Sequence, residues 1–168
     1  NISEIDVSKN TNLRSFHAVN SNKLERVVLP EGLAVLSIDY CPVSEMDLTS
    51  LTELESLAVN SIDIHSFDLS NNTKLTTLDI RDTTLTDGID ISANTALKTL
   101  VLSKCGLTSV DLSANKALTN VNLSKNSLAA VDLTNCTAAS VTLATHGNTM
   151  NIGVVDGEYD LKKLADYG

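Results

Sequence analysis

Residues 107–135 read LTSVDLSANKALTNVNLSKNSLAAVDLTN, and one short phrase is written three times within that stretch. Val-Asp-Leu-Ser begins at Val110, Val-Asn-Leu-Ser at Val121 and Val-Asp-Leu-Thr at Val131. In each phrase two apolar residues flank a polar one, which is the period of two expected of a strand with one buried face. The repetition therefore predicts several short strands of the same kind, packed side by side.

The pattern extends over most of the chain once the leading leucine of each unit is aligned. The leading positions are Leu13, Leu33, Leu54, Leu75, Leu97, Leu118 and, in a degenerate last unit, Ala138, so the units are 20 to 22 residues long. A fixed period of this length is typical of a solenoid, in which each unit forms one coil that packs on the next. Each unit begins with the phrase L-x-x-L-x-L-x-x-(N/C)-x-L, which is clearest in residues 97–107 and 118–128.

The second half of each unit contains another alternating triplet, followed by a turn. The triplets are Ile5-Asp6-Val7, Val27-Val28-Leu29, Met46-Asp47-Leu48, Phe67-Asp68-Leu69, Ile89-Asp90-Ile91, Val110-Asp111-Leu112 and Val131-Asp132-Leu133. The remainder of a unit is too short for a helix of average length. We therefore expect each coil to carry a front strand and a short return strand around one aliphatic core, in a nearly straight rod.

These repeats resemble the leucine-rich-repeat family over residues 2–148, most closely its short-repeat bacterial members and more distantly the internalins. The resemblance implies a leucine-rich-repeat solenoid of the α/β class, here rich in β-structure. Its expected form is a right-handed coil of about seven repeats with a parallel front sheet, short return strands on the back and little helix. We expect residues 1–148 to form the solenoid and residues 149–168 to cap it. In the last repeat, His146 is expected at the Asn position of the motif and Asn148 at a Leu position.

Composition and charge narrow the classes of partner. Of the 168 residues 42% are hydrophobic and 3% aromatic, with no Trp, so the core must be built from Leu, Ile, Val and Ala. A formal net charge of −9 disfavours nucleic acids and anionic membranes, because both need a cationic surface. No apolar run is long enough to insert into a membrane. The chain begins with Asn1 rather than Met, which indicates a processed or excised piece.

Stacking would turn each repeat position into a column of similar side chains. One column holds aspartates that are each followed two residues later by Ser or Thr: Asp6, Asp47, Asp68, Asp90, Asp111 and Asp132. These carboxylates are expected to accept hydrogen bonds from the residue two positions on. The alternative is a row of Ca²⁺ sites, although the Gly-rich calcium-binding repeat is absent. A second, structural column is expected from Asn10, Asn72, Asn94 and Asn115, shifting to Asn135 in the last turn.

No motif in the sequence indicates catalysis, a metal or another cofactor. The three cysteines lack metal-ligand spacing and are expected to be small buried hydrophobic residues. Cys41 and Cys105 occupy the same repeat position three coils apart, or roughly 14 Å, which is too far for a disulfide. Nucleophile-elbow, P-loop and dinucleotide-binding motifs do not occur. We therefore expect no enzyme activity and no cofactor.

The resemblance places a binding site among the outward side chains of the front sheet. Those side chains are mostly small and mildly polar, whereas contact hot spots favour Trp, Tyr and Arg. The few residues of suitable chemistry cluster toward the N-terminal half. The candidate binding residues are His17, Asp39, Tyr40, Asp79 and Arg81.

Together these observations predict a non-catalytic binding module of a bacterial cell-surface or secreted protein, with a role such as adhesion and a protein partner of unknown identity. The alternative is a structural stalk that has no ligand of its own, and an accessory domain of an enzyme is a more distant one. We expect a monomer, although the uncapped N-terminal coil offers an edge for edge-to-edge association, with Ile2, Ile5 and Val7 exposed there.

Overall fold

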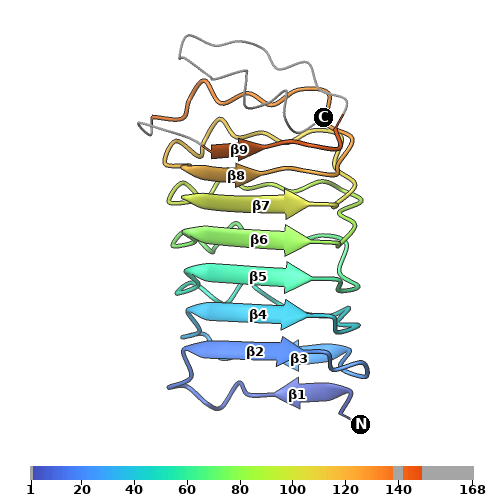
Figure 1. Ribbon diagram of the computed structural model, residues 1–168. Coiled ribbons are helices and arrows are strands. Elements are labelled where there is room, and N and C mark those ends of the chain that lie inside the picture. The colour runs from blue at the N-terminus through green and yellow to red at the C-terminus, as the bar shows by residue number, and fades with distance from the viewer. Residues whose placement is uncertain (1, 138–141, 149–168) are drawn as a thin grey trace.

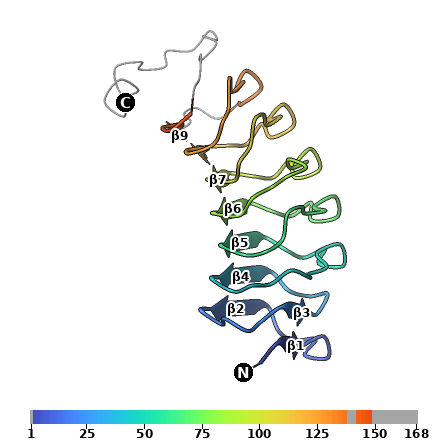
Figure 2. The same cartoon turned by 90° about the vertical axis from the view of Figure 1, so that its right-hand side faces the viewer.

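The computed structural model describes residues 2–137 and 142–148, which form a stack of coils with one large parallel sheet along its front (Figure 1). The sheet has seven strands in the order β2-β4-β5-β6-β7-β8-β9, so six complete turns separate the first strand from the last. Its members are β2 (Ser15–Val19), β4 (Val35–Asp39), β5 (Ser56–Asn60), β6 (Thr77–Arg81), β7 (Thr99–Ser103), β8 (Asn120–Asn122) and β9 (Thr142–Ala144). Figures 1 and 2 together show that the coil is right-handed. The predicted solenoid with a parallel front sheet is confirmed.

Neighbouring front strands pair position for position, without a slip. Leu57 of β5 lies opposite Leu36 of β4 and Leu78 of β6, and the same row continues to Leu100 and Val121. All five side chains are fully buried. Because strand side chains alternate between the two faces, a shift by one residue would expose this whole row, and burial therefore fixes the register.

The core is one continuous cluster of aliphatic side chains enclosed by the coils. The leading leucines Leu33, Leu54, Leu75, Leu97 and Leu118 are fully buried and alternate with the inward-facing residues of the front strands. Burying a leucine side chain contributes about 1.5–3 kcal/mol. The repeat is thus also the main source of stability, since each coil contributes the same buried positions.

Return strands form only at the N-terminal end of the stack. There, β1 (Glu4–Asp6) pairs in parallel with β3 (Arg26–Val28). From Met46-Asp47-Leu48 to Val131-Asp132-Leu133, the described return triplets form no strand, although Leu48, Leu69, Ile91 and Leu112 still reach the core. The prediction of a return strand on every coil is therefore wrong.

The bend of the stack explains the missing return ladder. Figure 2 shows the later coils leaning toward the side of the front sheet, so the front strands lie on the inside of the bend and the return turns on the outside. Paired strands must lie about 4.8 Å apart, and turns that fan outward cannot keep that spacing. The nearly straight rod predicted from two equal sheets is not observed, because the second sheet ends after β3.

The return turns are instead joined by buried asparagines. Asn72, Asn94 and Asn115 are 0% exposed, and each donates two hydrogen bonds from Nδ2 to carbonyls of the preceding coil. The predicted column is confirmed for these three residues. The predicted continuation of this column at Asn135 is wrong, because Cys136 takes that position. The N–H of Cys136 donates to Leu133 O at 2.9 Å, as the N–H of Asn115 does to Leu112 O.

The aspartate column forms the turns that follow the return triplets, as expected. In every case a carboxylate oxygen accepts the backbone N–H two residues on, at 2.8 to 3.0 Å. Thr49 and Ser70 also donate their hydroxyls, to Asp47 and Asp68 at 2.7 and 2.6 Å.

The last coil has a register different from the predicted one. β9 pairs with β8 so that Thr142 lies opposite Asn120, which places this repeat two residues later than an alignment on Ala138 does. Asn148 therefore stands at the Asn position: its Oδ1 accepts the N–H of Leu128 at 3.0 Å, and its Nδ2 donates to Leu123 O at 2.8 Å. The assignment of His146 to that position and of Asn148 to a Leu position is wrong, because the preceding return is longer than aligned. The predicted cap, residues 149–168, lies outside the described residues.

Within the same described ranges there is no helix long and apolar enough to cross a membrane.

Candidate binding surface

The register of the front sheet arranges its outward side chains in rows that run across the strands. The middle row is His17, Ser37, Ala58, Asp79, Val101 and Asn122, and the end row, next to the carboxyl ends of the strands, is Val19, Asp39, Asn60, Arg81 and Ser103. Among the outward residues of β2 to β8, the Asp and Arg side chains are Asp39, Asp79 and Arg81. All three lie on β4 and β6, on either side of β5.

A shallow hollow lies over β5 between these charged residues. It is lined by Asp39, Ala58, Val59, Asn60, Asp79 and Arg81 and has a volume of about 180 Å³. The hollow exists because Ala58, in the middle row, carries only a methyl group between its neighbours on β4 and β6. Three of the five predicted binding residues therefore lie around one depression of the front face.

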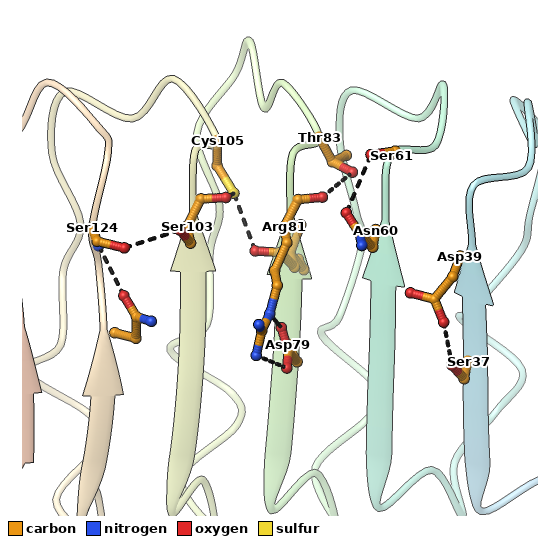
Figure 3. A network of polar contacts seen from close by, with 12 residues as sticks. Ser37, Asp39, Asn60, Ser61, Asp79, Arg81, Thr83, Ser103, Cys105 and Ser124 are labelled. Carbon is orange, nitrogen blue, oxygen red and sulfur yellow. Dashed lines mark hydrogen bonds and ion pairs between the residues drawn. The ribbon is translucent and has the colours of Figure 1, made fainter. Parts of the chain in front are cut away.

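Arg81 and Asp79 form a bidentate ion pair at one side of the hollow (Figure 3). Arg81 donates from Nε to Asp79 Oδ1 at 2.7 Å and from Nη2 to Asp79 Oδ2 at 2.8 Å. This hydrogen bonding raises the pKa of Arg81; partial burial opposes the shift, and the charges of Asp79 and Asp39 add to it. The guanidinium stays charged, and its fork holds the Asp79 carboxylate in one orientation.

Asp39 faces the hollow from the opposite strand and has no cation of its own. Its Oδ2 accepts a hydrogen bond from Ser37 Oγ at 3.0 Å (Figure 3). In the part of the chain that the structure describes, no Lys, Arg or His nitrogen lies within 4.0 Å of its oxygens. Asn60 lies between Asp39 and Arg81 in the end row, and its Oδ1 accepts from Ser61 Oγ at 3.2 Å.

The other two predicted residues lie outside the hollow. His17 is on β2, three strands or about 14 Å from Asp79, and its Nε2 is hydrogen-bonded to Ser15 Oγ at 2.7 Å. Tyr40 follows the end of β4, and the residue is 55% exposed. Sequence reasoning missed Ala58 and Asn60. The repeat alignment contained a signal for the hollow, because it places Ala58 between Ser37 and Asp79 and Ala58 is the smallest residue of the middle row.

The corner that follows each front strand has a left-handed backbone. Asn20, Tyr40, Ser61, Asp82, Lys104 and Lys125 all have φ between 48° and 58°, and Gly147 continues the column at 78°. Each of the six non-glycine N–H groups donates to the carbonyl at the equivalent repeat position of the next coil, as Tyr40 N does to Asn60 O at 2.8 Å. These bonds help to keep the residues of the end row in register across the strands. This conformation could not be predicted from the residue types, since six of the seven positions are not glycine.

The cysteines are structural in character. Cys41 and Cys105 are buried and Cys136 is partly buried, and none forms a disulfide. Burial raises the pKa of the Cys105 thiol to about 12 and also raises that of Cys136, so both thiols stay protonated and unreactive at neutral pH. Among the described residues, no group of three or more His, Cys, Asp or Glu side chains is arranged to hold a metal ion.

Comparison with known proteins gives a fold neighbour. No family model and no curated protein matches the chain. Among solved structures it is similar to the functional domain of InlJ from Listeria monocytogenes, which includes a cysteine ladder, with 28% identity over 92% of this chain and a TM-score of 0.81. This chain spans 34% of that solved chain. A weaker match is the internalin InlF from Listeria monocytogenes, with 18% identity, coverage of 86% and 64% of the two chains, and a TM-score of 0.37. With the coil period and the parallel sheet, the likeness to InlJ identifies the fold as a leucine-rich-repeat solenoid.

Proposed function

We propose that this leucine-rich-repeat protein is a non-catalytic binding module of a bacterial cell-surface or secreted protein, and that its front sheet contacts a protein partner. The proposal is supported by the similarity to a functional domain of InlJ and by the chemistry of the front face. Because the chain spans about a third of that domain, the activity of a longer protein would include surfaces that are not present here.

The observation that carries the proposal is the hollow over β5. Its charged groups, Asp39, Asp79 and Arg81, are held on β4 and β6, on either side of β5, in an otherwise uncharged face. An exposed ion pair such as Asp79–Arg81 contributes little to stability, about 0–1 kcal/mol. Its rigid placement beside an unpaired carboxylate is more useful for recognition, since fixed charges select partners and guide association.

The distribution of the remaining charge supports the same face. The six aspartates of the return column are exposed on the opposite side of the coils, where each is bonded within its own turn. Their carboxylates are therefore occupied in shaping the turns. On the front sheet, by contrast, the Asp39 carboxylate accepts the hydroxyl of Ser37 and shapes no such turn.

A capture experiment with matched variants tests the proposal. Ala58→Arg fills the hollow from the exposed face of β5, and Thr95→Arg adds the same side chain to an exposed return turn. Immobilised wild type and both variants are incubated with extracts of host cells and matrix, and the captured proteins are compared by mass spectrometry. We expect wild type and Thr95→Arg to capture the same protein and Ala58→Arg to lose it, with Tyr40→Ala and Arg81→Ala weakening capture.

The competing function is a stalk that only separates other domains, and the same experiment addresses it. If a protein is captured equally by wild type and Ala58→Arg, the front hollow is not the contact surface. If no protein is enriched over a resin without the domain, the stalk is the better description.

A further inference from the structure

We propose that the hollow over β5 receives the ammonium group of a lysine side chain on the protein partner. This inference rests on the proposed function and adds the chemistry of the contact. It follows from the charge of the hollow, from the acceptors around it and from the contacts that those acceptors already make.

The charge of the hollow favours a cation. Asp79 and Arg81 neutralise each other through their bidentate pair, whereas Asp39 has no cationic partner among the described residues. The three groups together therefore carry one net negative charge. An anionic side chain entering the hollow would be repelled by Asp39 and would have to share the positive charge of Arg81 with Asp79.

The acceptors are placed on three successive strands. Asp39 on β4, Asn60 on β5 and Asp79 on β6 all line the hollow, and each has a side-chain oxygen that can accept a hydrogen bond. A lysine ammonium has three N–H donors and no acceptor. The small side chain of Ala58 leaves the space between these oxygens open, so an ammonium can enter between them.

Existing contacts select lysine over arginine. A guanidinium binds best when both oxygens of a carboxylate are available to its planar fork. Both oxygens of Asp79 are occupied by Arg81, and Oδ2 of Asp39 accepts the hydroxyl of Ser37. What remains are single acceptor sites that point in different directions, which suit a compact ammonium group.

An NMR titration of the ¹⁵N-labelled protein tests this directly. The probes are Nα-acetyl-lysine methylamide and the corresponding arginine and glutamate compounds. We expect saturable shifts of the backbone amides of Ala58, Val59 and Asn60 with the lysine probe, a several-fold weaker effect with the arginine probe and none with the glutamate probe. Asp39→Asn should weaken lysine binding at least fivefold and Ala58→Leu should abolish it. Asp63→Asn removes an exposed carboxylate that does not line the hollow, and it should leave binding unchanged.

Several outcomes overturn the inference: no saturable shift up to the solubility limit of the lysine probe, stronger binding of the glutamate probe, or an equal effect of Asp39→Asn and Asp63→Asn. The proposed function fails separately. If front-face variants lose the captured partner but acetylation of the lysines of that partner does not reduce capture, the binding function stands and the lysine contact is wrong. If the lysine probe binds but capture does not depend on the front face, the hollow binds ammonium groups without being the partner site.

Discussion

At the scale of single residues, the buried asparagines of the return turns connect neighbouring coils by hydrogen bonds, as a second sheet would do. Asn94 donates from Nδ2 to Leu69 O at 3.0 Å and to Asn72 O at 2.9 Å, and Asn72 and Asn115 repeat this arrangement one coil away on either side. The carbonyls that accept these bonds also accept a backbone N–H within their own turn, as Leu69 O does from Asn72 N, so the amide adds a second bond that joins one coil to the next. A hydrogen bond of this kind contributes about 0.5–1.5 kcal/mol to stability.

Replacement of one of these asparagines should therefore destabilise the whole coil stack. Asn94→Ala removes two hydrogen bonds between coils, and we expect the free energy of unfolding to fall by about 1–3 kcal/mol. Asn10→Ala at the exposed end of the same column serves as the control and should change it by less than about 0.5 kcal/mol. Urea denaturation followed by circular dichroism measures both. Equal losses in the two variants would show that the buried amide bonds are not the source of the effect.

The left-handed corners carry a local conformational cost. For residues with a Cβ this conformation is unfavourable by roughly 1–2 kcal/mol, whereas glycine adopts it freely. Ser61, with φ of 53°, is a suitable test position because its N–H is bonded to Arg81 O. Ser61→Gly should raise the thermal midpoint by a few degrees and Ser61→Val should lower it. A corner that is not left-handed in solution would give shifts of the same sign, or none, for the two variants.

Three of the five binding residues could be predicted to lie together because repeat positions translate directly into rows. Asp39, Asp79 and Arg81 fall at outward positions of strands whose register the period already implies. The hollow could not be predicted as easily, since it depends on the methyl group of Ala58 between two larger neighbours. The place of Tyr40 depended on the corner conformation, which the sequence does not signal.

At the scale of the elements, local alternation was enough to predict the front strands, but the return strands needed information that alternation does not contain. Both triplet types alternate apolar and polar residues, and both point apolar side chains into the core. Beyond β3, among the described residues, the front strands alone keep the spacing that backbone pairing requires, because they lie on the inside of the bend (Figure 2). That bend is a property of several coils together and cannot be read from one repeat. The last coil was misaligned for a related reason, as its longer return conceals the register that β9 and Asn148 reveal.

The aspartate column should make stability depend on acid pH. For Asp47 and Asp68, bonds from the hydroxyls of Thr49 and Ser70, followed by those from the backbone N–H groups, hold the carboxyl pKa below its ordinary value of 3.8, against slight burial and the charge of a neighbouring aspartate. For Asp90 and Asp111 the backbone N–H is the leading cause of the lowered pKa. A pKa lowered by folding contributes stability above the unfolded value, and that contribution is lost as pH falls through the folded value.

We therefore expect the urea midpoint to be nearly constant between about pH 7 and 5 and to fall below about pH 4. Asp68→Asn keeps an oxygen that can accept the Ser70 bonds while removing a titrating group, so its midpoint should depend less steeply on pH in this range. A midpoint that rises on acidification would mean that repulsion between stacked carboxylates outweighs their hydrogen bonds.

At the scale of the whole molecule, the stack behaves as a one-dimensional array in which each coil contacts its neighbours. Deletion of residues 77–98 joins Thr76 to Thr99, which occupies the register position of Thr77. The product should remain folded, with a lower midpoint and a smaller dependence of unfolding free energy on urea, because one coil less of buried surface is exposed. Deletion of residues 77–87 removes β6 without its return and should prevent cooperative folding. A register-matched deletion that unfolds as completely as this half-coil deletion would contradict the array description.

The central claim is that each repeat forms one coil and that the coils stack in register through the front sheet. The most direct test is the pattern of through-space NMR contacts between backbone protons. The account predicts contacts that connect Leu36 to Leu57, Leu57 to Leu78, Leu78 to Leu100 and Leu100 to Val121 in one unbroken row. Contacts shifted by one residue along the strands, or helical contacts between residues three and four apart in their place, would contradict it.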